Sequence, residues 1–347
     1  MVSGGELAVA LASEFPVTSI YFHGNNKSVF ELEMAVDTGV GRVVLDNFHE
    51  IGLLNDIAIS KGVMQGVMIR LSPGIDPHTH EKTTTGVLDS KFGFSIETGD
   101  AAKAIRLVLN SEGLDLVGVH FHLGSPIFEL EPYSVAIDVV LNFLAPFKAE
   151  GFNLREFSPG GGFAIKYVNE DVPPPVSSYA QVITQAMRDK CAVLDFGEPM
   201  LVVEPGRAIV GRAGVALYTA GSIKEIPNVR KYVSVDGGMG DNIRPALYDS
   251  RYEAIVANRV SEGIDETITL AGKYCESGDV LVKKLNVPEL EPGDVVAIPA
   301  SGAYAPSMAS NYNMNPRPAV VMVHNGEASL IRRRESFKDM MSLDVID

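Results

Sequence analysis

The first 210 residues alternate short apolar runs with longer amphipathic stretches, and this alternation restricts the possible folds more than any other feature. The short apolar runs have the length of strands and occupy residues 19–23, 42–47, 67–71, 116–124, 156–162 and 201–207. The longer stretches space their apolar residues as helices do and occupy residues 6–12, 28–36, 48–61, 99–109, 133–150 and 179–193. Strand and helix in repeated alternation indicate a parallel sheet covered by helices.

Polar residues or glycines stand at the ends of many of these predicted strands, among them His23 and Asp46. In a βα barrel the carboxyl ends of the strands carry the active site. Residues 1–3 could be the end of one further strand, because a helix-like stretch follows at once. That makes seven strands, whereas a closed barrel of this type has eight. We therefore predict an α/β fold, a (β/α)8-type barrel that lacks its first βα unit.

The pattern changes beyond about residue 212, where short β-like runs are separated by Gly, Pro, Asn and Asp. These runs occupy residues 215–223, 232–236, 254–257, 267–271, 280–285, 295–298, 319–323 and 328–332. Closely spaced short strands with turn residues between them are typical of a mainly antiparallel β domain, a sandwich or barrel. We predict two domains, the βα barrel over residues 1–211 and the β domain over residues 212–347.

Charge and cysteine content restrict the partners and the compartment. A formal net charge of −15 argues against nonspecific binding to nucleic acid or to an anionic membrane. We find no run of about 18 apolar residues, so no membrane span is expected, and residues 1–6 do not resemble a signal peptide. Cys191 and Cys275 are the only cysteines, which fits a reducing compartment. The sequence thus predicts a cytoplasmic protein without nucleic-acid or membrane partners.

A phosphate site is indicated by glycines and an arginine at two neighbouring strand ends. Gly160, Gly161 and Gly162 follow one predicted strand, and Gly206 and Arg207 end the next. Glycines let backbone N–H groups approach an anion closely, and a guanidinium binds phosphate through several hydrogen bonds. The alternative is that the glycine triplet is a plain turn.

Glu204 stands at the end of an apolar run, and two interpretations stay open. It can be a strand-end acid paired with a basic side chain. It can also be the carboxylate that keeps the nitrogen of a heteroaromatic cofactor ring protonated, which strengthens the ring as an electron sink.

The histidines give weaker signals. His120 and His122 alternate along a strand, but no third ligand stands at metal spacing, so we expect no metal site. His122 is the better candidate to lie against a flat ligand ring, with Ser125 offering a hydroxyl to a phosphate, and His120 is expected to be structural. His78 and His80 lie in a loop-like stretch and are expected to be solvated.

Three further segments carry residues suited to charged small molecules. Arg244 and Tyr248 place a guanidinium and a phenol four residues apart, which suits a carboxylate, although a surface turn is the alternative. Cys275 stands beside Glu276 and a glycine turn, a thiol able to donate a proton near a charge, although a buried structural cysteine is the default. Tyr304 follows Gly302 and Ala303, which favours an exposed functional loop over core packing.

Taken together, a set of segments forms one pattern along the whole chain: Ser3-Gly4-Gly5-Glu6-Leu7, His23-Gly24-Asn25-Asn26-Lys27-Ser28, Asp89-Ser90-Lys91-Phe92-Gly93, His122-Leu123-Gly124-Ser125, the glycine triplet, Glu204-Pro205-Gly206-Arg207, Arg244-Pro245-Ala246-Leu247-Tyr248, Cys275-Glu276-Ser277-Gly278-Asp279, and the loop from Gly302 to Asn313. This pattern resembles the fold-type-III pyridoxal-phosphate decarboxylases, and within them most closely the group that converts meso-2,6-diaminopimelate to L-lysine and carbon dioxide, the last step of lysine biosynthesis.

The resemblance implies roles for the candidate residues. Residues implied to hold the phosphate of pyridoxal 5'-phosphate are Ser125, Gly160, Gly161, Gly162, Gly206, Arg207 and Tyr304. Glu204 is implied to pair with the pyridine nitrogen and His122 to stack on the ring. Residues implied to bind meso-diaminopimelate are Arg207, Arg244, Tyr248, Glu276 and Tyr304. Cys275 is implied to protonate the substrate carbon after carbon dioxide leaves.

The resemblance also bears on assembly and activity. It implies a homodimer with shared active sites, because Cys275 and Glu276 of one subunit would reach the site of the other. The family's lysine that binds the cofactor covalently lies upstream of the segment at which this sequence begins, so we expect little or no turnover from the chain as given. The alternatives are a non-catalytic decarboxylase-like protein that binds the cofactor or a partner enzyme, or a decarboxylase of a related diamino acid.

Overall fold

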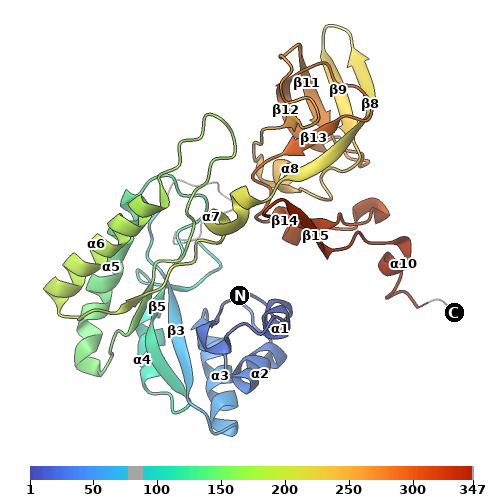
Figure 1. Ribbon diagram of the computed structural model, residues 1–347. Helices are drawn as coiled ribbons and strands as arrows, with labels where there is room; N and C mark the ends of the chain where they lie inside the picture. Colours follow the sequence, from blue (N-terminus) through green and yellow to red (C-terminus); the bar gives the residue numbers. More distant parts are fainter. Residues whose placement is uncertain (77–88, 346–347) are drawn as a thin grey trace. The chain divides into compact units, whose positions relative to one another are not determined.

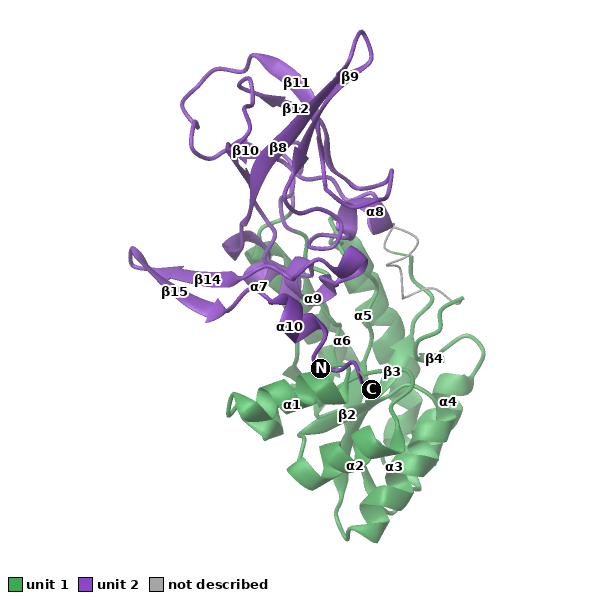
Figure 2. Cartoon of the chain, turned by 90° about the vertical axis from the view of Figure 1, so that its right-hand side faces the viewer, with its two compact units in different colours: residues 1–164, 174–205 green, residues 165–173, 206–347 purple. Residues whose placement is uncertain are grey.

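The computed structural model describes residues 1–76 and 89–345, so His78 and His80 lie outside the described residues. Its internal contacts divide the chain into two compact units (Figure 2). Unit 1 comprises Met1–Ala164 and Pro174–Pro205, and unit 2 comprises Ile165–Pro173 and Gly206–Asp347. The predicted domain boundary between residues 211 and 212 stays a prediction.

Unit 1 contains a parallel sheet whose strands follow one another in chain order. The strands are β1 (Tyr21–Phe22), β2 (Arg42–Leu45), β3 (Gln65–Ser72), β5 (Leu114–His120), β6 (Glu156–Ser158) and β7 (Met200–Leu201), with β4 (Phe94–Ser95) pairing beside β3. Each of the six predicted apolar runs overlaps one of these strands, so the predicted parallel sheet is confirmed; β4 was not predicted. A strand order without reversal is the winding of a barrel rather than of a doubly wound sheet.

Side chains from strands far apart in this order meet, which shows that the sheet is curved. Glu156 on β6 accepts a hydrogen bond from the hydroxyl of Tyr21 on β1, at 2.9 Å. The same carboxylate pairs with Arg42 on β2, at 2.5 Å. In a flat sheet with strands about 4.8 Å apart, β1 and β6 would be separated by roughly 20 Å. The sheet therefore curls as part of a barrel, as predicted.

Met1 lies beside β1. The terminal amino group donates to the carbonyl of Tyr21 at 2.8 Å, and the carbonyl of Met1 accepts from the amide of His23 at 2.7 Å. Bonds to the residues on either side of Phe22 follow the pattern of a parallel ladder. Met1 thus bonds to β1 as a neighbouring strand would, but no strand is assigned over residues 1–3, and the expectation of a further strand there stays a prediction.

The helices of unit 1 match the predicted stretches closely. They are α1 (Gly4–Ala12), α2 (Val29–Thr38), α3 (Phe48–Ser60), α4 (Asp100–Leu109), α5 (Glu131–Leu144), α6 (Val176–Leu194) and the short 3-10 turns η1 (Val17–Ser19) and η3 (Ala145–Glu150). Ser28 caps α2 in a capping box with Glu31, and Asn47 caps α3, so side chains satisfy the first free amides. Helices α5 and α6 lie side by side (Figure 1). No helix in the described ranges is long and apolar enough to cross a bilayer.

Unit 2 contains the predicted β domain. Its larger sheet has the order β10-β13-β8-β9-β11-β12, and β9 and β11 form its parallel pair. The strands are β8 (Ala216–Ile226), β9 (Arg230–Val235), β10 (Ile255–Val256), β11 (Glu266–Ala271), β12 (Val280–Val287) and β13 (Val295–Ile298), with β14 (Val320–His324) and β15 (Glu327–Arg332) forming a separate ribbon. Each predicted run overlaps one of these strands, and the other pairings are antiparallel. The prediction of a mainly antiparallel domain is therefore confirmed.

Short helices join the strands of unit 2. They are α7 (Gly206–Val210), η4 (Gly211–Ala213), α8 (Arg244–Tyr248), α9 (Ala305–Met308), η5 (Tyr312–Met314) and α10 (Phe337–Met340). One local prediction is wrong here. The apolar run 201–207 is not a strand throughout, because β7 ends at Leu201 and Gly206 and Arg207 open α7. The arginine is therefore presented by a helical turn instead of by a strand end.

Candidate active site

The glycine triplet closes one part of the carboxyl edge of the sheet in unit 1. Gly161 bridges to Glu204, and the amide of Glu204 donates to the carbonyl of Gly160 at 2.9 Å. A Cβ on Gly161 would stand 2.0 Å from the carbonyl oxygen of Glu204. Gly162 has a φ of +95°, and a Cβ there would stand 2.2 Å from the carbonyl oxygen of Gly124. Only glycine permits this approach of three strand ends, so the triplet is more than a plain turn.

Glu204 is the polar centre of this edge. Its Oε1 lies 3.1 Å from Nε2 of His23, which follows β1, and its Oε2 lies 3.4 Å from Nε2 of His120, at the end of β5. The hydroxyl of Ser158 at the end of β6 is 3.4 Å from Oε1. The two imidazole rings pack edge to face with 4.7 Å between their centroids. Three strand ends thus direct hydrogen-bond donors to one carboxylate.

These contacts fix the ionisation of the group. Burial alone would raise the pKa of Glu204, but His120 and His23, which face its two oxygens, outweigh burial and hold the pKa well below the ordinary value. Burial lowers the pKa of His120 to about 4. At neutral pH the site therefore contains an ionised carboxylate that accepts hydrogen bonds from uncharged imidazole.

His23, His120 and Glu204 also form a set of metal-ligand types, with ligand atoms within 4.8 Å of one another. The two short distances are those of direct hydrogen bonds from Nε2 to the carboxylate. A nitrogen that donates a proton offers no lone pair to an ion. Moreover, Nδ1 of His120 is buried without a hydrogen-bond partner, whereas metal-bound histidines use the second nitrogen to fix the ring. The contacts are better explained as hydrogen bonds by which His23 and His120 fix the carboxylate of Glu204.

His122 and Ser125 lie in the segment that follows β5. Nδ1 of His122 accepts the amide hydrogen of Gly161 at 3.3 Å, which joins this segment to the glycine triplet. Burial lowers the pKa of His122 to about 3, so the ring is uncharged at neutral pH. An uncharged, fixed imidazole is suited to stacking on a flat ring, and the stacking role stays a prediction.

Two predicted arginines and a predicted tyrosine come together in unit 2. The guanidinium of Arg207 lies 4.6 Å from the centre of the Tyr304 ring, and that of Arg244 lies 5.4 Å from it. Both arginines are buried and contact the ring of Tyr167, Arg207 also donating to its hydroxyl at 2.5 Å. Arg244 donates to the hydroxyl of Tyr252 at 2.8 Å. Two cations held among phenol rings form a positive surface suited to phosphate or carboxylate.

Close backbone packing brings the Tyr304 loop to the Arg207 helix. Gly302 donates from its amide to the carbonyl of Gly211 at 3.0 Å, just after α7. A Cβ on Gly302 would stand 2.0 Å from the carbonyl oxygen of Val210. Tyr304 itself has φ 68° and ψ −44°, a region that residues other than glycine rarely adopt. Such backbone strain collects at functional sites, where surrounding contacts maintain it.

Cys275 and Glu276 form a second cluster in unit 2. Cys275 is exposed and unpaired, so the default of a buried structural cysteine does not hold. Its sulfur lies 3.3 Å from the amide nitrogen of Asn313 and 3.8 Å from the hydroxyl of Tyr312, which donates to Glu276. The structure thus places the thiol, the carboxylate and a phenol together.

Sequence analysis assigned no individual role to five residues of these clusters: His23, Tyr167, Tyr252, Tyr312 and Asn313. His23 was detectable, because it follows a predicted strand as the other site residues do. Tyr312 and Asn313 belong to the loop that carries the family resemblance. Tyr167 and Tyr252 gave no signal, because their pairing with arginines depends on the tertiary fold. Tyr248 is the last residue of α8, which begins at Arg244.

Lys27 is buried in unit 1, where its amino group contacts three acceptors. Its amino group pairs with Glu50 and donates to the carbonyls of Gly24 at 2.8 Å and Val44 at 2.9 Å. Burial lowers the pKa of Lys27. These three acceptors tie the segment after β1 to β2 and α3. Lys27 therefore has a structural role.

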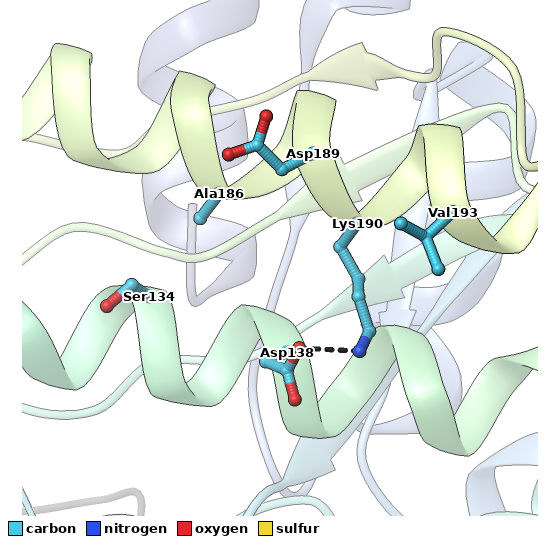
Figure 3. A pocket seen from close by; sticks show the side chains of 6 residues that line it. All are labelled: Ser134, Asp138, Ala186, Asp189, Lys190 and Val193. Atoms are coloured by element: carbon cyan, nitrogen blue, oxygen red, sulfur yellow. Dashed lines mark ion pairs between the residues drawn. The ribbon is translucent and has the colours of Figure 1, made fainter.

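A pocket distinct from both clusters lies between α5 and α6 (Figure 3). It is lined by Ser134, Asp138, Ala186, Asp189, Lys190 and Val193. Lys190 and Asp138 form an ion pair across it, at 2.6 Å. None of these six lining residues is a predicted site residue.

Comparison with known proteins decides the family. Residues 1–211 match the pyridoxal binding domain of the pyridoxal-dependent decarboxylases. The chain belongs to the pyridoxal-dependent decarboxylase family. Diaminopimelate decarboxylase of Bacillus subtilis is 47% identical over 346 residues, which cover 99% of this chain and 79% of that protein.

Solved structures agree with this membership. Diaminopimelate decarboxylase from M. jannaschii in complex with L-lysine superposes with a TM-score of 0.93 at 36% identity, covering 100% of this chain and 79% of the other. The Helicobacter pylori enzyme in complex with L-lysine superposes with a TM-score of 0.90 at 34% identity, covering 99% of this chain and 83% of the other. The predicted family and its fold, a βα barrel followed by a β domain, are confirmed.

The residues of the structure fit the cofactor of the pyridoxal-dependent decarboxylases. A pyridine nitrogen needs an ionised carboxylate, and Glu204 is ionised and held by His23 and His120. In unit 2, buried Arg207 offers a guanidinium suited to a phosphate. In unit 1, the amides of Gly160 and Gly161 donate to Ser158 and His122, so the phosphate role of the glycine triplet stays a prediction.

Proposed function

We propose that the chain binds pyridoxal 5'-phosphate and catalyses the decarboxylation of meso-2,6-diaminopimelate to L-lysine and carbon dioxide. The observation that carries the proposal is the ionised Glu204, held by two histidines at the carboxyl edge of a parallel sheet. Membership in the family and 47% identity with a diaminopimelate decarboxylase support the choice of substrate.

The proposed cofactor site uses the residues that the family resemblance implies. Glu204 would hold the pyridine nitrogen protonated, and His122 would lie on the ring. The phosphate would be held by Ser125, Gly160, Gly161, Gly162, Gly206, Arg207 and Tyr304. Glu204 and Arg207 are close in the chain, so one short stretch would serve both ends of the cofactor.

When bound, pyridoxal phosphate supplies an electron sink for the electron pair that remains on the substrate carbon as carbon dioxide leaves. Ionised Glu204 favours that role because it stabilises positive charge on the ring nitrogen. Cys275 would then transfer the proton of its S–H bond to the carbon, and the resulting thiolate would regain a proton from solvent. The exposure of Cys275 suits both transfers.

The substrate has a carboxylate and an amine at each end. Its recognition therefore needs both positively and negatively charged side chains in the protein. Arg207, Arg244, Tyr248 and Tyr304 would bind carboxylates, and Glu276 would bind the distal amine. The buried guanidinium groups of Arg207 and Arg244 share the Tyr304 ring, which supports a joint role. An arginine fork suits a carboxylate because it offers two parallel hydrogen bonds.

We further propose a cytoplasmic homodimer in which Cys275 and Glu276 of one subunit serve the site of the other. Exposed Cys275 is compatible with a reducing compartment. Neither a nucleic acid nor a membrane is a proposed partner, in keeping with the net charge of −15.

The test is an assay of the protein with pyridoxal phosphate and meso-diaminopimelate. L-lysine and carbon dioxide should appear in equal amounts, and E204Q should abolish most of this activity. Binding of the cofactor without release of carbon dioxide from any diamino acid would instead favour the non-catalytic alternative. Faster decarboxylation of another diamino acid would favour the alternative that the chain is a decarboxylase of a related diamino acid.

A further inference from the structure

The thiol of Cys275 is contacted by two consecutive residues of the turn η5, Tyr312 and Asn313. Nδ2 of Asn313 donates to the sulfur at 3.3 Å, and the hydroxyl of Tyr312 lies 3.8 Å from it. Neither residue has a role in the function proposed above. We propose that Asn313 and Tyr312 are positioning residues for the Cys275 thiol. The inference rests on the proposed proton transfer from Cys275.

Asn313 contacts Cys275 at two points. Its Oδ1 accepts the backbone amide hydrogen of Cys275 at 3.3 Å, while its Nδ2 donates to the sulfur. A single planar amide thus spans the backbone and the end of the side chain, which restrains rotation of the thiol about its Cα–Cβ bond. The donated hydrogen bond also stabilises the thiolate that remains after proton transfer.

The backbone of Asn313 is adapted to this contact. Its φ of 52° and ψ of 27° lie in the left-handed region, which asparagine adopts more readily than most residues. Asn311, two residues before Asn313, anchors the turn by donating from its side-chain amide to Glu335 at 2.6 Å and to the carbonyl of Asn315 at 3.0 Å. The side-chain amide of Asn313, which contacts the thiol, therefore lies in a turn that is itself fixed by hydrogen bonds.

Tyr312 connects the thiol with Glu276. Its hydroxyl donates to Oε1 of Glu276, and this bond, followed by the contact with Cys275, raises the pKa of Tyr312, so that the phenol keeps its proton. The ring stacks on Tyr274 at 6.1 Å with 12° between the planes. Because one hydroxyl faces both groups, a change at Glu276 is transmitted to the sulfur through Tyr312.

The segment that carries Cys275 is equally well supported. Asp279 is buried, and it accepts the amide hydrogens of Tyr274 at 2.9 Å and Met239 at 2.7 Å. Both sides of the thiol contact thus rest on fixed backbone, which is what a precise proton transfer requires.

The experiment measures the alkylation rate of Cys275 by iodoacetamide over a range of pH, in the full-length protein. Cys191 is buried, and a C275S variant identifies the reacting thiol. N313G keeps the left-handed backbone and removes the amide. Loss of one donor to the thiolate should slow alkylation about fivefold at neutral pH and move its pH profile to higher pH. N325G, which removes another asparagine with a positive φ, is the matched control and should leave the rate unchanged.

The link through Tyr312 is tested with Y312F, E276Q and the double variant. If the hydroxyl couples Glu276 to the sulfur, the effect of E276Q on the alkylation rate should largely vanish in the Y312F background. Y232F, which removes the hydroxyl of a half-buried tyrosine on β9 that accepts from Arg230, is the control. Rates in N313G equal to those of the unmodified protein, or additive effects of Y312F and E276Q, would overturn the proposal. Alkylation needs neither cofactor nor substrate, so these outcomes are independent of whether the protein decarboxylates diaminopimelate.

Discussion

His23 and Glu204 face each other with 3.1 Å between Nε2 and Oε1, although they follow the first and last strands of the parallel sheet. In a flat sheet these strands would lie about 24 Å apart. The contact therefore exists only because the sheet curls, so the ionisation of the candidate carboxylate depends on the barrel curvature. Fold and site chemistry are coupled at this pair.

Replacing Glu204 by Gln should lower the decarboxylation rate on the order of 100-fold or more, because a neutral amide cannot stabilise a protonated ring nitrogen. The change is nearly isosteric, so the affinity for pyridoxal phosphate should fall much less. Steady-state kinetics and cofactor titration would separate the two effects. E33Q, on the exposed surface of α2, is the control and should behave as the unmodified protein. An E204Q protein with normal turnover would exclude the proposed role.

Lowering the pH from about 6.5 to about 4 should destabilise the protein through His120. Burial lowers the pKa of His120 to about 4, so over this window the unfolded chain binds a proton that the folded chain does not. The contribution of His120 to the free energy of unfolding is thus fully present above about pH 6.5. It should fall by roughly 3 kcal/mol as the pH is lowered to about 4. H120Q keeps a donor for Glu204 and should show a flatter curve of unfolding free energy against pH. Equal curves for both proteins would contradict the prediction.

The sequence predicted the secondary structure well because its signals are local. Strand and helix periodicity, caps such as Ser28 with Glu31, and turn residues all act within a few positions along the chain. The short strand β4 escaped prediction because its two residues make no pattern of their own. Gly206 and Arg207 were misassigned because an apolar run does not show where a ladder ends.

The site was predictable as a set of residues but not as a set of contacts. Glu204 was selected from its place at a strand end, yet its two histidine partners follow from the curvature of the sheet. His120 was expected to be structural, whereas the structure places its Nε2 against the carboxylate. The tyrosines around Arg207 and Arg244 come from remote parts of the chain, so no short motif contains them.

Replacing Gly161 by Ala should destabilise unit 1 by about 3 kcal/mol or more, since the new Cβ would stand 2.0 Å from a backbone oxygen of Glu204 that cannot yield without moving the strand end. Gly52 in α3 is the matched control, because no atom lies within 4 Å of a Cβ placed there. G52A should stabilise the protein by roughly 0.5–1 kcal/mol, as alanine favours a helix over glycine. Chemical denaturation should show a lower free energy of unfolding for G161A and a higher one for G52A than for the unmodified protein.

Replacing Glu335 by Gln should loosen the turn that carries Tyr312 and Asn313, in a manner that depends on pH. Hydrogen bonds from Arg317, first from its side chain and then from its amide, lower the pKa of Glu335 to about 2. The ion pair therefore adds stability above the ordinary carboxyl pKa of about 4.5 and loses it as the pH falls toward 2. The pair is half-buried and still reached by solvent, so E335Q should cost about 1 kcal/mol or less at pH 7. In unfolding curves this difference in the free energy of unfolding should shrink between about pH 4.5 and 2. E327Q, on the exposed strand β15, is the control and should show no such dependence on pH. If E335Q and the unmodified protein differed in free energy of unfolding by the same amount at all pH values, the charge of Glu335 would not be what stabilises the turn.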